Sequence, residues 1–320
     1  MNTVPLLPVV LGYPASGGRA GVAGVFYLSV LRVLFVWLGF CWLARAHAAT
    51  VTITDDNGSQ VSFDAPPQRI ISLAPSITEL AYAAGLGDRM VAVTAFSDYP
   101  EPAKVLPQVG DAFRLDWERI VALRPDLVLA WRSGLSARDR DAFEKLKLKL
   151  LVLEPHRLDD IPRTLRLLGR VAVANALAES AALDFEKRRD ALRSRFSTRP
   201  AVRAYFQIAD APLLTINGEH IISDVLHLCG AENVFADAHS LTPVVSDEAL
   251  VRARPQLLLG IADTTEQSVE IRKRWRDLPL EAARRGKVAF VPADLIGRPS
   301  PRIVQGAEQV CMLVDASRDN

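Results

Sequence analysis

Two segments in opposite halves of the chain share a pattern that limits the possible folds. Residues 117–130 (WERIVALRPDLVLA) and 247–260 (DEALVRARPQLLLG) are identical at six of 14 aligned positions. Each predicts a short helix, an Arg-Pro break and then an apolar strand. A helix leading into a buried strand is typical of parallel α/β sheets, so we predict two similar lobes of that class. Chance similarity between two common helix–proline–strand units is the alternative.

The sequence around both copies alternates between strand and helix patterns. It begins with a predicted hairpin at 50–63, whose turn contains Asn57-Gly58. Ser76 and Glu79 have the spacing of a helix capping box. In the first half we predict strands at 69–73, 90–94, 127–130 and 150–153, and helices at 76–84, 115–123 and 137–146. In the second half we predict strands at 202–207, 257–260 and 287–291, and helices at 221–228 and 302–314.

Residues 159–196 carry almost no strand signal, and their apolar residues recur at helical spacing. We predict one long helix here, with a break near Asn175 as the alternative. The predicted organisation is therefore two similar parallel-sheet α/β lobes that a long rigid helix joins, with a ligand cleft between the lobes. The predicted parts are a hairpin at 49–67, an N-terminal lobe at 68–158, a connecting helix at 159–199 and a C-terminal lobe at 200–320.

The first 48 residues contain no Asp or Glu, three Arg and an apolar run at 33–44. That run of 12 residues is shorter than the roughly 20 that span a membrane and fits the roughly 7–15 of a signal peptide. Ala46-His47-Ala48 has the small-x-small pattern of a cleavage site. We predict a cleavable signal peptide at 1–48, of which 1–21 form an unusual extension, and an exported protein. An uncleaved membrane anchor is the alternative.

Export changes the meaning of the three cysteines. Cys41 lies within the predicted signal, so the exported chain keeps Cys229 and Cys311. Two cysteines in an oxidising compartment favour one disulfide, with two buried free thiols as the alternative.

Composition and motifs exclude several functions. Lys and Arg (38) almost balance Asp and Glu (37), which gives no support to a nucleic-acid-binding surface. The sequence has no Walker A loop, no HExxH and no Gly-x-Ser-x-Gly, so we predict neither an enzyme nor a metal site. An exported enzyme that uses Asp294 or a histidine as its acid–base group is the remote alternative.

Ligands of open α/β sheets bind beyond the carboxyl ends of the strands. Tyr99 and Trp131 follow two predicted strands and offer flat apolar faces with polar edges. Asp294 and Arg298 follow a strand of the second half and offer charged hydrogen bonds. We therefore predict that these four residues line the cleft. A place in the hydrophobic core is the alternative for each aromatic residue.

Five segments carry a family resemblance. They are 69–85 (RIISLAPSITELAYAAG), 97–100 (SDYP), 115–132 (LDWERIVALRPDLVLAWR), 225–235 (VLHLCGAENVF) and 300–303 (SPRI). Over about residues 69–315 the chain resembles the periplasmic cobalamin-binding proteins of ABC importers. These belong to a wider helical-backbone group that also binds iron-siderophores and haem.

The resemblance implies a periplasmic, monomeric protein that binds a corrinoid between its lobes without a cofactor or a reaction. It implies ring contacts from Tyr99 and Trp131 and polar contacts from Asp294 and Arg298. Phe113 stands beside the position of an expected Trp and substitutes for it.

Two further pairs of residues gain a role from the resemblance. Cys229 and Cys311 match a family disulfide. Glu118 and Glu248 match glutamates that form salt bridges with the ABC transporter permease, and they occupy equivalent positions of the repeat. Two related carboxylates suit a two-fold symmetric partner. Complementing a helix dipole is the alternative for each.

The chain departs from the family on the second lobe. Leu214, Thr242 and Leu295 stand where members often have aromatic residues. This departure leaves other ligands open, such as a cobinamide or another flat metal chelate. The second hypothesis is thus an iron-siderophore or haem receptor, whose anionic ligand would be attracted by Arg132, Arg298 and Arg302.

Overall fold

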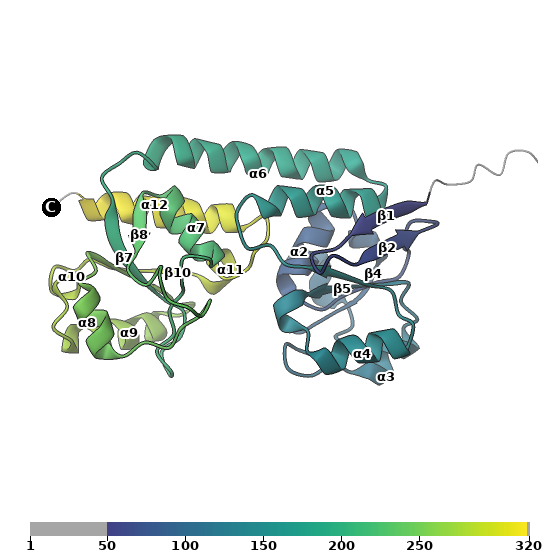
Figure 1. The fold of residues 1–320 in the computed structure, drawn as a ribbon, viewed down its shortest axis with the longest axis horizontal. Coiled ribbons are helices and arrows are strands. Elements are labelled where there is room, and N and C mark those ends of the chain that lie inside the picture. The colour runs from purple at the N-terminus through teal and green to yellow at the C-terminus, as the bar shows by residue number, and fades with distance from the viewer. Residues whose placement is uncertain (1–49, 319–320) are drawn as a thin grey trace, which may run out of the picture. The chain divides into compact units, whose positions relative to one another are not determined.

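Two four-stranded parallel sheets form the centre of the structure, a computed structural model that describes residues 50–318 (Figure 1). The predicted signal peptide lies outside the described residues. The first sheet has the order β4-β3-β5-β6, with β3 (Ile70–Ser72), β4 (Met90–Val93), β5 (Leu127–Trp131) and β6 (Leu150–Leu153). The second has the order β10-β9-β7-β8, with β7 (Val202–Gln207), β8 (Ala231–Asn233), β9 (Leu257–Ile261) and β10 (Val288–Val291).

The two sheets have the same strand topology. In each, the first strand along the chain lies between the second and the third, and the fourth lies beyond the third. The strands of the two repeat copies, β5 and β9, occupy the same place in this order. The predicted fold class of two similar parallel-sheet lobes is confirmed.

The predicted hairpin is formed by β1 (Val51–Thr54) and β2 (Gln60–Phe63), which pair antiparallel. The carboxylate of Asp55 closes its turn by accepting from the backbone N–H of Asn57 and Ser59. The same carboxylate accepts from the N–H of Val152 in β6, which attaches the hairpin to the first lobe.

The helices follow most of the predicted positions. The first lobe has α2 (Pro75–Ala83), α3 (Trp117–Ala122) and α4 (Ala137–Lys145). The second lobe has α7 (Ile221–Leu228), α8 (Asp247–Ala253), α9 (Thr265–Asp277), α10 (Glu281–Arg284), α11 (Ala293–Ile296) and α12 (Ile303–Arg318). Short 3-10 turns lie at Gly87–Arg89, Glu101–Val105 and Arg132–Gly134.

The capping box that we predicted at Ser76 and Glu79 is wrong. Helix α2 begins after Ala74, which has no side-chain cap, and Pro75 occupies its first turn. A capping box does occur at Thr264 and Gln267, where it begins α9, a helix that the sequence analysis missed. Glu79 instead makes contacts across the molecule, which we describe below.

The segment between the lobes forms two helices and not the single long helix that we predicted. The break lies near Asn175, as the alternative proposed. Helix α5 (Asp160–Ala172) ends at Val173, which has a left-handed φ of 54°, and α6 (Asn175–Phe196) returns along it. Gly169 permits this close packing, since a Cβ there would collide with the Cβ of Ala178. In Figure 1, α6 runs above both lobes.

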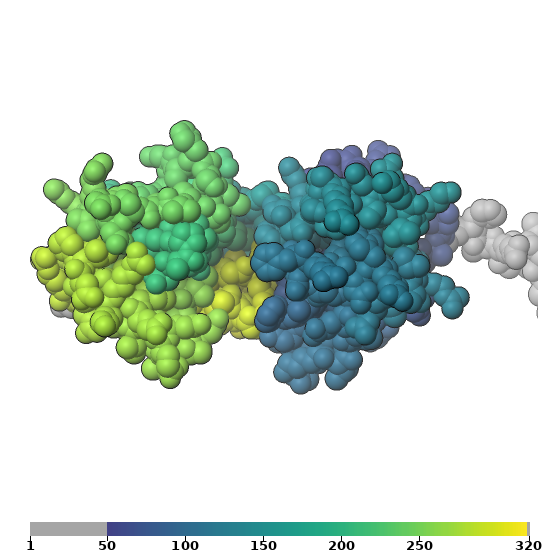
Figure 2. All heavy atoms as spheres, turned by 90° about the horizontal axis from the view of Figure 1, so that it is seen from below, coloured from purple at the N-terminus to yellow at the C-terminus, as the bar shows by residue number. Residues whose placement is uncertain are grey.

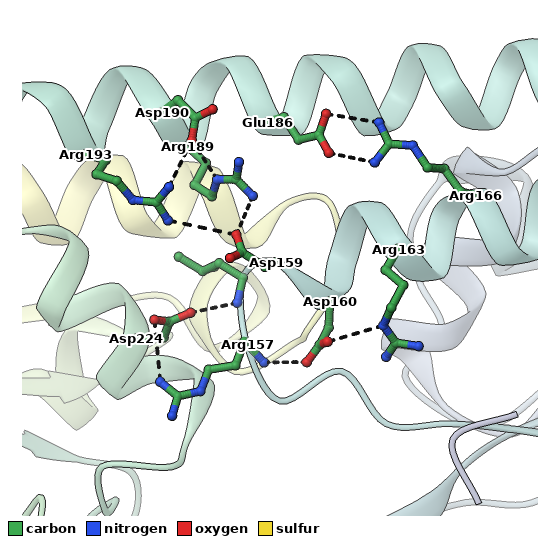
Figure 3. Close-up of polar contacts among 11 residues, drawn as sticks. Arg157, Asp159, Asp160, Arg163, Arg166, Glu186, Arg189, Asp190, Arg193 and Asp224 are labelled. Carbon is green, nitrogen blue, oxygen red and sulfur yellow. Dashed lines mark hydrogen bonds and ion pairs between the residues drawn. The ribbon is translucent and has the colours of Figure 1, made fainter. Parts of the chain in front are cut away.

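Charged side chains hold the chain between β6 and α5 in place (Figure 3). Asp224 of α7 accepts from the N–H of Leu158 at 2.8 Å and lies 3.8 Å from the Arg157 guanidinium. Asp159 pairs with Arg189 and Arg193 of α6. This linker is thus bonded to helices on both sides.

A disulfide joins Cys229, at the end of α7, to Cys311 in α12, so the predicted pairing is present. Both cysteines are fully buried. Within residues 50–318, none of the helices is both long and apolar enough to span a membrane.

Candidate ligand-binding site

A cavity of about 330 Å³ lies at the carboxyl edge of the first sheet, where β3, β4 and β5 end. Its walls come from the segments after these strands, from the loop 111–115 and from residues 297–299 of the second lobe. Figure 2 shows the two lobes from below, with yellow atoms from the chain near residue 300 lying between them. The cavity therefore lies where the prediction placed a ligand cleft.

Trp131, the last residue of β5, lines this cavity as predicted. Its indole N–H donates to the carboxylate of Glu154 at 3.0 Å. Glu154 is buried and also accepts from the N–H and the hydroxyl of Ser133 at 2.7 and 2.8 Å. Gly134 lies against the ring, since a Cβ there would come 2.9 Å from Trp131 Cε3. The indole is therefore fixed while 37% of the residue stays exposed.

Two phenylalanines bring further aromatic surface to the cavity. Phe113 is 98% exposed and sits in a loop whose Asp111 carboxylate accepts from the N–H of Phe113 and Arg114. Phe96 is 76% exposed and has a left-handed φ of 65°. The sequence pattern does not single out Phe96, although this residue stands two positions after the strand signal at 90–94.

Tyr99 lies away from this cavity. Its ring packs under the guanidinium of Arg302, with 4.1 Å between Arg302 Cζ and the ring centroid. It lines a second cavity of about 340 Å³ together with Phe185 of α6. Among the described residues, those that line the Trp131 cavity include neither Tyr99 nor Asp294.

Arg298 lines the Trp131 cavity and belongs to a polar cluster that joins the lobes. The cluster consists of Glu79, Asp98, Arg298, Ser300 and Arg302. Glu79 of α2 has a side chain only 1% exposed. It accepts from Arg298 Nη1 at 3.1 Å, from the Ser300 hydroxyl at 2.6 Å and from Arg302 at 2.7 and 2.9 Å. The segments 69–85 and 300–303 therefore meet each other in this cluster.

Arg298 also bonds to two other carboxylates, Asp98 at 2.7 Å and Asp294 at 2.6 Å. Desolvation opposes its charge, but hydrogen bonds to Asp98 and Glu79 outweigh this and raise the pKa of Arg298. For Asp98, desolvation acts in the opposite direction and raises the pKa of the carboxyl. The hydrogen bond and the positive charge of Arg298 outweigh this and leave the pKa of Asp98 below its ordinary value. The guanidinium is thus strongly held by protein groups.

Glu118 and Glu248 occupy the second position of α3 and α8, and both are exposed. Each helix begins with a matching cap, in which Asp116 accepts from the N–H of Arg119 and Ser246 from that of Ala249. A hydrogen bond from Ser246 is the main cause that lowers the pKa of Glu248. The two lobes thus place these glutamates equivalently.

Comparison with known proteins identifies the family. Residues 70–295 match the model of a family described as periplasmic binding protein. The chain belongs to this family. It is 39% identical over 244 residues to the vitamin B12-binding protein of Yersinia pestis (strain Pestoides F), which covers 76% of this chain and 85% of that protein.

Solved structures show the same relationship. The structure of the periplasmic vitamin B12-binding protein of Vibrio cholerae superposes with a TM-score of 0.73 at 33% identity and covers 80% of this chain and 99% of that one. A periplasmic haem-binding protein of Roseiflexus sp. RS-1 superposes with a TM-score of 0.69 at 23% identity over 78% of this chain and 99% of that one. At that identity, the second likeness shows the shared fold alone.

In the part of the chain that the structure describes, no group of three or more His, Cys, Asp or Glu side chains is placed to hold a metal ion. The cavity has flat aromatic surface, and the charge of Arg298 in its wall is paired with protein carboxylates. This arrangement is suited to holding a planar molecule by contact.

Proposed function

We propose that this protein binds a corrinoid such as cobalamin in the periplasm and delivers it to the permease of an ABC transporter. The observation that carries the proposal is the cavity at the lobe boundary, where a fixed Trp131 lies with the exposed Phe96 and Phe113. The relatives named vitamin B12-binding proteins support the corrinoid as its ligand.

The aromatic residues favour a large flat ligand. Exposed apolar side chains gathered at a hollow mark a binding surface, because water is displaced when a ligand covers them. A planar ring that covers Trp131 and Phe96 removes apolar area from water at roughly 25 cal/mol per Å². No bond of the ligand changes in this function, in keeping with a family of binding proteins. We propose that the signal peptide directs export and that the protein acts as a monomer.

The charges at the cavity favour a corrinoid over an anionic haem or siderophore, the second candidate. Arg298 and Arg302, which we expected to attract anionic ligands, are paired with Glu79. A corrinoid carries mainly neutral amide arms and needs no such attraction. Arg132, the third cation that we expected to attract an anionic ligand, is not among the described residues that line the cavity, whereas Arg114 lines it and would favour an anionic chelate.

Glu118 and Glu248 are the proposed docking residues for the permease. Their equivalent, exposed positions on α3 and α8 support this role. A permease with two-fold symmetry would present matching arginines to both lobes.

Calorimetry with purified protein and cyanocobalamin tests the ligand. We expect binding in wild type and a loss of about 1–3 kcal/mol in Trp131→Ala. Leu177→Ala, which removes an exposed side chain of α6, is the control and should bind normally. No binding at about 10–50 µM would reject cobalamin. A panel of haem and ferric siderophores would then decide between the remaining ligands.

A further inference from the structure

Arg298 uses both terminal nitrogens of its guanidinium within the protein. Nη1 donates to Glu79 at 3.1 Å and to Asp98 at 2.7 Å. Nη2 donates to the backbone carbonyl of Phe96 at 3.1 Å and lies 2.6 Å from Asp294. Both terminal nitrogens are therefore engaged within the protein, through three hydrogen bonds and one ion pair. Arg298 thus lines the cavity while these two nitrogens contact protein groups.

The carbonyl that accepts this bond belongs to Phe96, a residue with an unfavourable backbone conformation. Phe96 has a φ of 65°, a region that non-glycine residues adopt only when their surroundings hold them there. The carbonyl also accepts from the N–H of Asp98 at 3.0 Å, which closes a tight turn. The bond from Arg298 comes from the other lobe, about 200 residues further along the chain, and holds this turn from outside.

Glu79 in turn holds Arg298. Its buried carboxylate belongs to the first lobe, as Phe96 does, and it binds Arg298, Ser300 and Arg302 of the second. Without that carboxylate, the two neighbouring arginines of the second lobe would repel each other with less compensating charge, and we expect Arg298 to reorient.

We propose that Glu79 is a positioning residue for ligand binding, acting through Arg298 on the backbone of Phe96. The aromatic ring that meets the ligand in the first lobe is thus held by a guanidinium from the second. This inference rests on the proposed function for its ligand.

A second contact between the lobes provides a matched control. Asp224 of α7 accepts from the N–H of Leu158 and approaches Arg157, and this contact includes neither Phe96 nor Arg298 (Figure 3). Asp224→Asn removes one carboxylate charge between the lobes, as Glu79→Gln does, and keeps an oxygen that can accept. A general loosening of the lobes would affect both variants, whereas loss of Phe96 positioning would affect Glu79→Gln alone.

The experiment is a double-mutant cycle with cyanocobalamin as the probe. We expect Glu79→Gln to weaken affinity about tenfold and Asp224→Asn to stay within about twofold of wild type. In a Phe96→Ala background, Glu79→Gln should change affinity by less than about twofold, since its target is gone. Equal affinity of Glu79→Gln and wild type would overturn the proposal, as would the same loss in both backgrounds.

A measurement without ligand separates this inference from the proposed function. Hydrogen exchange at the Asp98 amide, which donates to the Phe96 carbonyl, should be faster in Arg298→Lys than in wild type, because lysine cannot reproduce the four contacts. If Glu79→Gln does not fold, Arg298→Lys replaces it in the binding experiment. Unchanged exchange would overturn the positioning role. Absence of cyanocobalamin binding by wild type, together with faster exchange in Arg298→Lys, would reject the proposed ligand and support the positioning role.

Discussion

The indole N–H of Trp131 donates to the carboxylate of Glu154 across the edge of the first sheet. Trp131 ends β5 and stands in register with Leu153 of β6, so Glu154 is the next residue beyond that strand. The parallel pairing of these strands therefore brings a buried acceptor to the side of the ring. Glu154 fixes which face of the indole meets the cavity.

The first prediction concerns this pair. Glu154→Ala should weaken cyanocobalamin binding by about tenfold, because the indole loses the bond that orients it. It should also lower the free energy of unfolding by about 1–3 kcal/mol, since the Ser133 donors lose their acceptor. Glu154→Gln keeps an oxygen acceptor and should bind more tightly than Glu154→Ala. Calorimetry and urea unfolding measure the two effects, and normal affinity in Glu154→Ala would contradict the orienting role.

The second prediction separates Phe96 from Tyr99. Phe96→Ala should weaken cyanocobalamin binding by about 1–2 kcal/mol with little change in stability, because the ring is exposed at the cavity. Tyr99→Ala should instead lower stability by about 1 kcal/mol, since Arg302 loses the ring that it packs on. Its affinity should remain close to that of wild type. A larger affinity loss in Tyr99→Ala than in Phe96→Ala would return Tyr99 to the ligand site.

The fold was predictable from sequence because its signals are local. The repeated helix–proline–strand unit marks β5 and β9, and it extends over 14 residues in each copy. Helix α9 escaped because its surface is mostly polar and only Trp275 is buried in it. The break between α5 and α6 was visible only as an alternative, because Val173 adopts a left-handed conformation that its residue type does not favour.

The site was less predictable because its contacts join distant residues. Glu79 and Arg298 are 219 positions apart, and the local spacing of Ser76 and Glu79 suggested a helix cap instead. Tyr99 and Phe96 follow the same strand, and the sequence pattern does not say which of them turns toward the cavity. In the structure Phe96 lines the cavity and has a left-handed conformation, of which residue type alone gives no sign.

The third prediction concerns the disulfide. Cys229 and Cys311 are 82 residues apart, so the bond restricts a long loop of the unfolded chain. Replacing both by Ser should lower the free energy of unfolding by about 2–5 kcal/mol. Urea unfolding of wild type with a reductant should approach that of the double variant. Equal stability of oxidised wild type and the variant would contradict the structural role.

The fourth prediction is a dependence of stability on pH through His220. This residue caps α7, and its Nδ1 accepts from the N–H of Ile222 at 3.1 Å. Burial, helped by the nearby charge of His156, lowers the pKa of His220 from 6.5 to about 4. Because the unfolded chain binds this proton more readily, the contribution is complete above pH 6.5 and is lost as the pH falls toward 4.

The expected loss is at most about 3 kcal/mol over that range, measured by urea unfolding at a series of pH values. His220→Asn can cap the helix without titrating, so its stability should fall less between pH 6.5 and 4. The difference between the two curves isolates His220 from the carboxylates. Parallel curves would exclude it as the titrating group.

The fifth prediction concerns Glu118 and Glu248 on the equivalent helices α3 and α8. The variant Glu118→Ala/Glu248→Ala should lose uptake of vitamin B12 by cells that depend on this protein, because it no longer pairs with the permease. Its affinity for cyanocobalamin should stay within about twofold of wild type, since both side chains are exposed outside the cavity. The control Glu179→Ala/Glu308→Ala removes the same charge from α6 and α12, where surface ion pairs contribute little, and should support normal uptake. Retained uptake in the first variant, or a loss of its affinity, would show that these glutamates do not serve docking.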